Sequence, residues 1–230
     1  MTYNICHGKG MDNKVDLSRA AAVINQVKPR FVGLCEMDCK ARRTNGDDQP
    51  ETLAKLCGNM KATFGKAIDF QGGGYGVAVL SDTEPLNSKT VPLPGAEPRI
   101  LLLCEFEDCV IGVTHLSVSK ESERTESVKL IREAIAGYGK PVFVMGDWNS
   151  LPNSTVLTEM RQYLKVLSDE QARTYHGHPS NGPSGTVSDF CIDYIAVDNA
   201  HADSVQVFDR ITVPDEVTSD HKAIAIKIAL

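Results

Sequence analysis

The order in which strand-like and helix-like segments follow one another is the feature that most restricts the fold of this chain. Strand and helix signals alternate at the start, five strand-like segments follow one another in the middle, and alternation returns at the end. Alternating elements are typical of sheets covered by helices, whereas consecutive strands joined by tight turns favour hairpins. The pattern therefore predicts a mixed α/β (α+β) architecture with helices on the outside.

Helices are predicted where apolar residues recur at helical spacing beside capping residues. Asp16 is a suitable N-cap for the first helix, and Pro29 stops it. The predicted helices are Leu17–Val27, Pro50–Cys57, Ser122–Ala136 and Ser154–Tyr163. The predicted strands are Met1–Cys6, Phe31–Glu36, Ala62–Asp69, Tyr75–Ser81, Ser88–Leu93, Arg99–Phe106, Cys109–Leu116, Val142–Met145, Cys191–Val197, Ser204–Phe208 and Ala223–Ala229. The segments Met37–Gln49 and Tyr175–Ser188 are predicted to be loops.

The composition of the chain is that of a soluble globular protein. No linker or low-complexity segment divides it, so we predict a single domain over residues 1–230. No apolar run reaches the roughly 18 residues of a transmembrane helix, and no leader is visible ahead of the first strand. We therefore expect a cytoplasmic protein by default, with secretion as the alternative if a leader has been removed. No feature implies a protein partner.

Charge and cysteine content narrow the function further. The formal net charge is −6, from 24 Lys and Arg against 30 Asp and Glu. General nucleic-acid binders are usually basic because neutralising phosphates supplies most of their affinity, so the acidic balance argues mildly against a nuclease. The seven cysteines are odd in number and include no Cys-x-x-Cys pair. Reduced, structural thiols are expected, rather than a disulfide framework or a structural zinc site.

Residues capable of chemistry stand at the ends of several predicted strands. Asp147 and Asn149 follow the apolar run Pro141–Met145 and, being two residues apart, point to the same side of an extended chain. A carboxylate can take a proton from water, while a carboxamide can donate a hydrogen bond to an oxyanion. Further candidates at strand ends and in the tail are Asn4, Glu36, His115, Asp193, Asp220 and His221.

These residues belong to six short motifs whose order resembles the endonuclease/exonuclease/phosphatase superfamily of Mg²⁺-dependent phosphoesterases. Each motif is weak alone, but six in the right order, from Asn4 to His221, form a strong signal. The resemblance implies a four-layer α/β/β/α sandwich of two mostly antiparallel sheets, with the active site at one end. The motifs are Tyr3-Asn4, Glu36 after the second strand, Thr114-His115-Leu116, Gly146-Asp147-Trp148-Asn149, Ile192-Asp193-Tyr194 and Ser219-Asp220-His221.

The resemblance also implies a metal site. Glu36 would be the main ligand, helped by Asn4, and Asp220 would lie near the metal. Carboxylate and carbonyl oxygens are the hard ligands that Mg²⁺ prefers, so Mg²⁺ is the expected cofactor, with Mn²⁺ as a possible substitute. A solvated carboxylate at a strand end is the alternative for Glu36 taken alone.

The remaining motif residues would carry out the reaction. By resemblance, Asp147 would orient and deprotonate the attacking water, and Asn149 would position that water or a phosphate oxygen. His115 and His221 would flank the phosphoryl group, and Asp193 would hold His221, fixing its tautomer and keeping it charged. An Asx turn is the alternative for Asp147 and Asn149. The family more often has an aliphatic or Phe residue where Trp148 stands, so we expect Trp148 to be a packing substitution.

Three substrate-binding candidates are weaker. Tyr75 lies in the glycine-rich segment 72–76, which could admit substrate or only form a hairpin tip. His176 lies in Thr-Tyr-His-Gly, where related sequences have Thr-Phe-His-Gly. Arg42, next to Arg43, could meet a phosphate or be solvated.

The predicted function is hydrolysis of a phosphate ester by in-line attack of water. Apurinic-site nucleases of the superfamily tend to carry Tyr at the position of His115, whereas His is commoner in branches that resemble sphingomyelinases, inositol-polyphosphate phosphatases and deadenylases. A small phosphodiester, phospholipid headgroup or phosphorylated metabolite is therefore the favoured substrate. A Mg²⁺-dependent nuclease acting on DNA or RNA is the alternative. A non-catalytic binding module is disfavoured because Glu36, Asp147 and His221 are all present.

Overall fold

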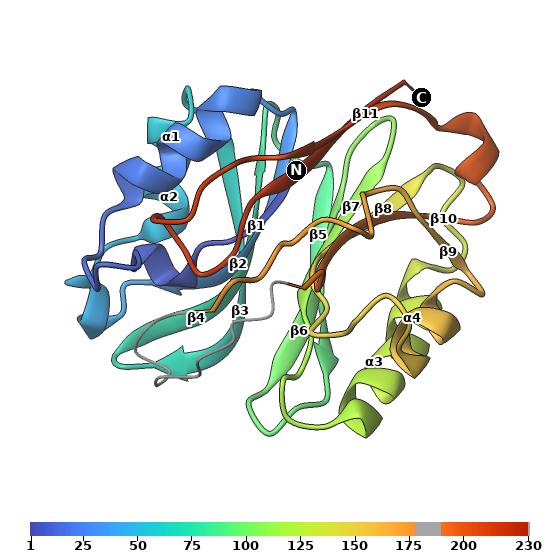
Figure 1. Cartoon of the computed structure of the whole chain (residues 1–230), viewed down its shortest axis with the longest axis horizontal. Coiled ribbons are helices and arrows are strands. Elements are labelled where there is room, and N and C mark those ends of the chain that lie inside the picture. Colours follow the sequence, from blue (N-terminus) through green and yellow to red (C-terminus); the bar gives the residue numbers. More distant parts are fainter. Residues whose placement is uncertain (178–189, 230) are drawn as a thin grey trace.

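The computed structural model describes residues 1–177 and 190–229. In this part of the chain, two six-stranded sheets pack face to face, and helices cover the outer face of each (Figure 1). The four-layer α/β/β/α sandwich predicted from the sequence is confirmed.

Each sheet gathers strands from distant parts of the sequence. The first sheet contains β1 (Thr2–Asn4), β2 (Phe31–Cys39), β3 (Lys61–Phe70), β4 (Gly73–Ser81), β11 (Gln206–Thr212) and β12 (Ile224–Ala229). The second contains β5 (Asn87–Leu93), β6 (Arg99–Glu105), β7 (Val110–His115), β8 (Val142–Asp147), β9 (Leu164–Val166) and β10 (Asp193–Asp198). The α-helices are α1 (Leu17–Val27), α2 (Gln49–Leu56), α3 (Glu121–Ile135) and α4 (Thr155–Met160), and short 3₁₀ turns are η1 (Cys6–Gly8), η2 (Arg42–Thr44) and η4 (Ala202–Ser204).

The two sheets share one plan of pairing. Their strand orders are β11-β12-β1-β2-β4-β3 and β5-β6-β7-β8-β10-β9. Within the described strands, β1 with β2 and β7 with β8 are parallel, and all other neighbours are antiparallel. Each parallel pair lies at the centre of its sheet, so two central strands of each sheet end at the same edge. The prediction of mostly antiparallel sheets is confirmed.

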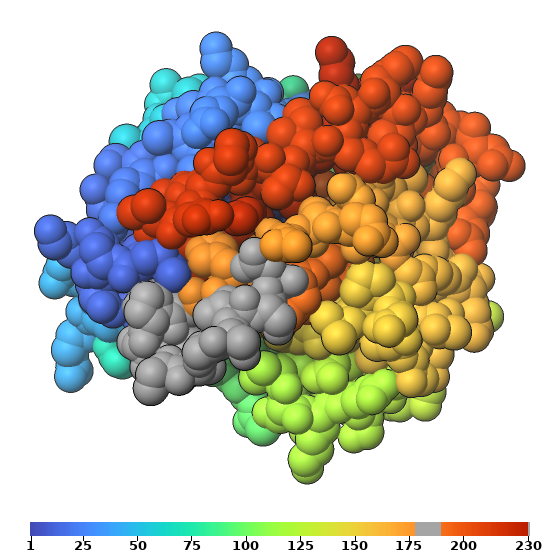
Figure 2. All heavy atoms as spheres, in the orientation of Figure 1, coloured from blue at the N-terminus to red at the C-terminus, as the bar shows by residue number. Residues whose placement is uncertain are grey.

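Three apolar layers hold the sandwich together. The inner layer lies between the sheets and contains Val77, Val79, Leu102, Val113 and Met145. A second layer lies under α1 and α2, and a third under α3 and α4. Figure 2 shows the blue N-terminal part and the yellow and green middle part on opposite sides, with red C-terminal segments crossing between them. The C-terminal part of the chain therefore returns to the first sheet, through β11 and β12, after the second sheet is complete.

Most predicted elements are present, with differences at their ends. The first predicted strand stops at Asn4 because Cys6 and His7 adopt positive φ angles of 47° and 45°. Strand β2 runs on to Cys39, into the predicted loop Met37–Gln49, because a bulge keeps it paired with β4. The strand β9 has three residues, too few for their alternation to stand out, and the sequence did not predict it. The predicted loop Tyr175–Ser188 lies mostly outside the described residues.

Two expectations from composition also have structural counterparts. All seven cysteines are free, and six are buried, as expected for structural thiols. In the ranges 1–177 and 190–229, no helix combines the length and apolarity needed to cross a bilayer.

Candidate active site

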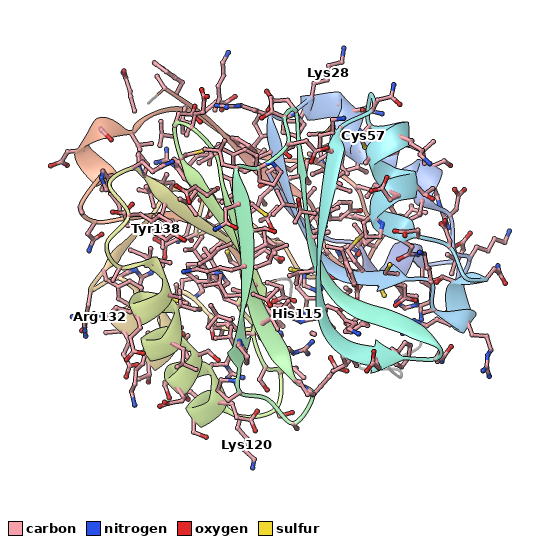
Figure 3. All side chains as sticks on the ribbon, turned by 180° about the vertical axis from the view of Figure 1, so that it is seen from behind. Lys28, Cys57, His115, Lys120, Arg132 and Tyr138 are labelled. Carbon is pink, nitrogen blue, oxygen red and sulfur yellow. The ribbon has the colours of Figure 1, made fainter. Side chains whose placement is uncertain are left out.

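The sheet register brings the motif residues of the second sheet into one row. His115, the last residue of β7, is the register partner of Asp147 at the end of β8, and Asp147 is also opposite Asp193 at the start of β10. In the first sheet, Asn4 ends β1 beside Cys35 of β2. Figure 3 shows His115 between the two sheets, whereas Lys120 and Arg132 lie at the periphery. The strand ends of both sheets therefore meet at one end of the sandwich.

A β-bulge aims the side chain of Glu36. Between Leu34 and Met37, two residues of β2 face one residue of β4, and Glu36 has a φ of 59°. A bulge re-aims a side chain at the expense of local pairing, and a left-handed conformation is uncommon for a residue other than glycine. Backbone strain of this kind costs of order 1–3 kcal/mol and persists where surrounding structure enforces it. Glu36 is half-buried and lines the cleft.

Gly146, next to Asp147 in β8, allows the backbone to pass close to β7. Its φ is 139°, and a Cβ at this position would lie 1.9 Å from the carbonyl oxygen of Thr114. Asn149, with a φ of 47°, donates from its backbone N–H to Asp147 Oδ1 at 2.9 Å and from Nδ2 to the carbonyl of Leu116 at 2.9 Å. An Asx-type turn is therefore present, and it leaves Asp147 Oδ2 facing the other site residues. Since the turn orients the carboxylate, the turn and a catalytic role are compatible.

Trp148 points away from the site into the outer core. Its side chain is fully buried, and its ring lies 4.9 Å from that of Tyr194. The expected packing role is confirmed.

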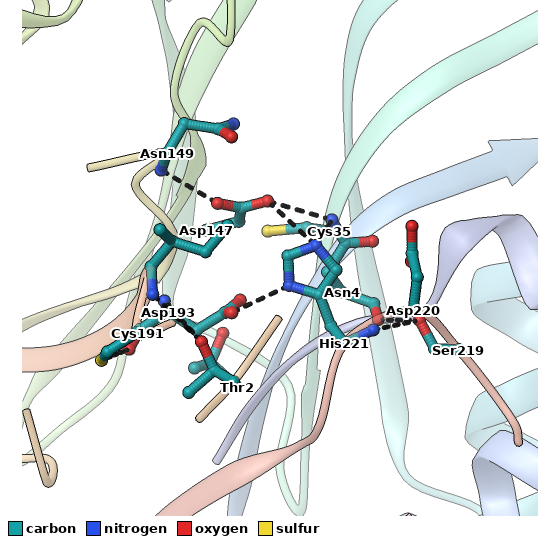
Figure 4. Close-up of polar contacts among 12 residues, drawn as sticks. Thr2, Asn4, Cys35, Asp147, Asn149, Cys191, Asp193, Ser219, Asp220 and His221 are labelled. Carbon is teal, nitrogen blue, oxygen red and sulfur yellow. Dashed lines mark hydrogen bonds and ion pairs between the residues drawn. The ribbon is translucent and has the colours of Figure 1, made fainter. Parts of the chain in front are cut away.

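His221 lies between two carboxylates (Figure 4). Its Nδ1 is 2.8 Å from Asp193 Oδ2, and its Nε2 is 3.6 Å from Asp147 Oδ2. Burial of the ring opposes protonation, but the negative charges of Asp193 and Asp147 and the hydrogen bond to Asp193 outweigh it and raise the pKa of His221 to about 10. The imidazole is therefore a cation at neutral pH. Burial is also the main cause that raises the pKa of Asp147, with the charge of His221 acting against it.

His115 differs from His221 in its charge. Its Nε2 lies 3.4 Å from Asp147 Oδ2, and its Nδ1 is buried without a hydrogen-bond partner among the described residues. Burial, together with the positive charges of Arg99 and His221, holds the pKa of His115 well below its usual value. The ring is therefore neutral at pH 7 and can donate a hydrogen bond, but it does not supply a full positive charge.

Asn4 links the two sheets through its amide nitrogen. Nδ2 donates to Glu36 Oε1 and to Asp147 Oδ2, both at 3.1 Å, while Oδ1 accepts from the backbone N–H of Cys6 at 3.0 Å. Because its oxygen is occupied by the backbone, Asn4 turns a donor toward Glu36. The predicted role of Asn4 as a metal ligand, for which the amide oxygen would be needed, stays a prediction. In this arrangement Asn4 positions the two carboxylates.

Acidic residues and a histidine near the cleft could hold a metal ion. Asp147, Asp193 and His221 offer ligand atoms within 4.8 Å of one another, although both nitrogens of the His221 ring already face carboxylates. Glu36 and Asp220 line the same cleft and offer hard oxygens. Burial, followed by the charge of Asp220, raises the pKa of Glu36. A carboxylate in this position fits a cation, which would relieve both effects.

The motif residues border a cleft with a volume of about 510 Å³. Its polar members include Glu36, Tyr75, His115, Asp147, Asn149, Asp220 and His221. Tyr75 is buried, and desolvation raises the pKa of its hydroxyl. A larger cavity of about 600 Å³ lies at the other end of the sandwich, beside Phe31 and Ile226, and none of the predicted site residues lines it.

Two predicted substrate contacts lie outside the described cleft lining. Arg42 is exposed on η2. Its neighbour Arg43 donates from Nε and Nη2 to buried Asp38 at 2.7 and 2.8 Å, which is a structural ion pair. His176 is half-buried, and its backbone N–H donates to the carbonyl of Asp220 at 3.0 Å.

Sequence reasoning missed several residues that do line the cleft. Arg99 is buried at the start of β6, with its Nη1 2.6 Å from Glu97 Oε1. A charged residue opening an otherwise apolar strand was the signal that could have identified it. Tyr175, one position before His176, lies with its ring 4.9 Å from that of His221. The other missed lining residues are Glu97, Val118, Leu151, Phe190 and Ile192.

Comparisons with known proteins agree with this fold. The sequence profile of the Endonuclease/Exonuclease/phosphatase family matches residues 1–221. No curated protein matches the chain at a significant level. Among solved structures, an endonuclease/exonuclease/phosphatase from Beutenbergia cavernae is 22% identical with a TM-score of 0.79, and the match covers 100% of this chain and 70% of that one.

Two further solved structures are similar over nearly the whole of both chains. The mannosyl-6-phosphatase of Bacteroides thetaiotaomicron is 15% identical with a TM-score of 0.73, and the match covers 100% of this chain and 98% of that one. The D. rerio TDP2, complexed with a single-strand DNA product, is 18% identical with a TM-score of 0.74, and the coverage is 100% and 97%. At these identities the likeness concerns the fold.

Proposed function

The chain belongs to the endonuclease/exonuclease/phosphatase family, and from this premise we propose that it is a metal-dependent phosphoesterase that hydrolyses a small phosphate ester. The family identifies it as a hydrolase of the phosphoesterase or nuclease type. The observation that carries the finer proposal is the convergence of Glu36, Asp147 and His221 on one cleft, with Asn4 joining the carboxylates of the two sheets.

Asp147 is the proposed general base. Its Oδ1 is held by the backbone of Asn149, so Oδ2 is the oxygen that faces the cleft. Burial raises the pKa of this carboxyl, which makes its ionised form a stronger base than a solvated aspartate. Asp147 takes a proton from water as that water attacks phosphorus in line, and Asn4 keeps the acceptor oxygen in place.

The two histidines stabilise charge on the phosphoryl oxygens in different ways. His221 carries a positive charge, which Asp193 maintains from the side remote from the cleft. His115 is neutral and donates a hydrogen bond. Phosphoryl transfer needs donors and charges positioned in advance more than it needs covalent chemistry. A cation and a neutral donor on either side of Asp147 meet that need.

Glu36 and Asp220 are the proposed ligands of a divalent cation, with Mg²⁺ favoured because both offer carboxylate oxygens. When bound, such an ion would neutralise charge on the phosphoryl group. Both Glu36 and Asp220 line the cleft, which supports this assignment.

The cleft lining favours a small ester over a polymer. Among the described lining residues, Arg99 is the one permanent cation, and it is paired with Glu97. The rim includes the exposed apolar side chains Val118 and Leu151, and Phe190 also lines the cleft. Nucleic-acid sites usually present several Lys and Arg to successive phosphates. The lining therefore supports a phosphodiester, phospholipid headgroup or phosphorylated metabolite with one apolar or neutral substituent.

The test is Mg²⁺-dependent turnover across a panel of substrates. The panel comprises an aryl phosphodiester, the matching monoester, sphingomyelin, inositol phosphates, supercoiled plasmid and polyadenylate. The blank is Asp147→Asn, which keeps the side-chain volume and removes the base. We expect turnover of at least one small ester that is lost in the variant and on chelation of the metal.

The outcomes separate the alternatives. Faster turnover of plasmid or polyadenylate than of every small ester would replace the proposal with a nuclease. Turnover that persists in Asp147→Asn would remove Asp147 from the role of base. The absence of turnover on the whole panel in the presence of bound Mg²⁺ would contradict the proposed substrate classes.

A further inference from the structure

Two ligand-type side chains, Cys6 and His7, lie beside Glu36 and have no part in the proposed reaction. The Cys6 thiol, a ring nitrogen of His7 and a Glu36 carboxylate oxygen all lie within 4.8 Å of one another. Cys6 is buried, and His7 and Glu36 are half-buried. We propose that Cys6, His7 and Glu36 form a site for a borderline-soft divalent ion such as Zn²⁺, next to the Mg²⁺ position and sharing Glu36 with it.

The donor set decides which ion the site would take. A thiolate, an imidazole and a carboxylate are ligands typical of zinc, and three protein ligands leave one position of a tetrahedron open. Mg²⁺ prefers oxygen donors and does not take a thiolate. The same glutamate can therefore serve a hard ion together with Asp220 or a softer ion together with Cys6 and His7. Binding of Zn²⁺ would convert the Cys6 thiol to a thiolate and release its proton to water.

The backbone holds these side chains in place without a metal. Cys6, His7 and Gly8 all have positive φ angles, of 47°, 45° and 77°. The backbone N–H of Cys6 donates to Asn4 Oδ1 at 3.0 Å, and Gln49 Nε2 donates to the carbonyl of His7 at 2.8 Å. These bonds fix a tight left-handed turn directly after β1. A preorganised turn lowers the entropy that ordering the ligands would otherwise cost.

One ligand-type atom of the group, His7 Nδ1, makes no hydrogen bond to the described residues. This nitrogen is buried. Buried polar atoms are almost always paired, so an exception needs an explanation. A coordinated ion, either at Nδ1 or at the other nitrogen with Nδ1 orienting the ring through a water, would supply it. A short sequence motif does not indicate this site, because its third ligand, Glu36, lies thirty positions from Cys6.

The site predicts a specific inhibitory effect. An ion held by Cys6 and His7 would draw Glu36 away from the Mg²⁺ position, so Zn²⁺ would oppose Mg²⁺ and excess Mg²⁺ would restore activity. This consequence rests on the proposed function of Glu36, whereas binding itself does not. The experiment therefore measures binding and activity separately.

Binding is measured on the full-length, untagged, metal-free protein with Co²⁺ as a spectroscopic substitute for Zn²⁺. We expect a thiolate-to-cobalt charge-transfer band in the near ultraviolet that Zn²⁺ removes. The band should be lost in Cys6→Ser and retained in Cys57→Ser, a matched control in which another buried thiol, at the end of α2, is changed. His7→Gln should weaken Zn²⁺ binding in calorimetry by more than the roughly 10- to 100-fold that loss of an outer-shell partner costs, which gives a second test if Cys6→Ser fails to fold.

Three results would overturn the proposal: no cobalt–thiolate band in the wild type, a band that persists in Cys6→Ser, or Zn²⁺ affinity unchanged in His7→Gln. Where a substrate has been found, Cys6→Ser should keep Mg²⁺-dependent turnover and lose inhibition by Zn²⁺. If the protein shows the cobalt band but no turnover, the proposed zinc site stands and the proposed function falls. If it shows turnover but no cobalt band, the proposed function stands and the zinc site falls.

Discussion

The pairing of His221 with Asp193 can be tested by a single substitution that changes charge and little else. Asp193→Asn keeps the volume of the side chain and an oxygen that can accept from His221 Nδ1. It removes the negative charge 2.8 Å from the ring. The pKa of His221, about 10 in this structure, should then fall, because Asp193 is the largest of the causes that raise it.

The magnitude follows from the geometry. An opposite charge at contact distance shifts a pKa by about 1–3 units, and full burial favours the upper end, so the pKa of His221 should fall to about 7. Because its folded-state pKa lies above the unfolded value of 6.5, the charged pair stabilises the fold fully below pH 6.5, and this stabilisation is lost as pH rises toward 10. Between pH 6 and pH 9 the wild type should lose about 3 kcal/mol of unfolding free energy through this group, and the variant about 0.5 kcal/mol.

Two assays and one control variant measure the effect. Imidazole NMR of the metal-free protein reports the pKa of His221, and urea unfolding at pH 6 and pH 9 reports the change in stability as a difference between variant and wild type. Asp198→Asn is the control, because Asp198 Oδ2 makes a similar contact with His201 Nδ1, at 2.7 Å, outside the cleft. The control should leave the titration of His221 unchanged.

The same variant should alter the pH profile of turnover. Once His221 loses its proton near neutral pH, the descending limb of kcat/KM moves from the alkaline range toward pH 7. A His221 pKa that changes by less than about half a unit in Asp193→Asn would refute the electrostatic argument. An unchanged descending limb together with a shifted pKa would instead show that the charge of His221 does not matter for the reaction.

Two other positions allow sharp predictions of stability. Gly146→Ala should cost about 3 kcal/mol or more of unfolding free energy and abolish turnover, because a φ of 139° is nearly exclusive to glycine and the new Cβ would meet a carbonyl of β7. The control Gly139→Ala, whose Cβ would have no atom within 4 Å, should change the urea midpoint little. Arg43→Met should cost about 3–5 kcal/mol of unfolding free energy, because it leaves the fully buried charge of Asp38 without its partner. The control Arg30→Met breaks an exposed ion pair and should cost under about 1 kcal/mol. Equal losses of stability in the two variants would contradict the argument.

Local sequence signals predicted the elements but not how they are aimed. The bounds of α1 follow from Asp16, whose side chain accepts from the backbone N–H of Ser18, and from apolar residues at helical spacing. The bulge at Glu36 had no such signal. It depends on two residues of β2 facing one of β4, and a pairing between strands about forty residues apart is not visible in either strand alone.

The site shows the same division between residue type and orientation. The order of the motifs was sufficient to predict that His115, Asp147 and Asp193 lie together, because the sheet register places these three residues opposite one another on neighbouring strands. The orientation of Asn4 was not predictable, since a backbone N–H two residues later takes its oxygen. Arg99 was missed because its role depends on which strand end lies opposite the motifs, and that is a property of the packed sandwich.

The close approach of the two sheets explains why function is tied to the inner core. At Gly33, a Cβ would lie 2.8 Å from side-chain atoms of both Met145 and Val113, which belong to the opposite sheet. This spacing allows Asn4, at the end of the neighbouring strand, to reach Glu36 in its own sheet and Asp147 in the other with one amide group. A larger residue at this contact would force these side chains to shift or the sheets to separate. Any separation of the sheets would lengthen the hydrogen bonds of Asn4 first, because a single short side chain makes both of them.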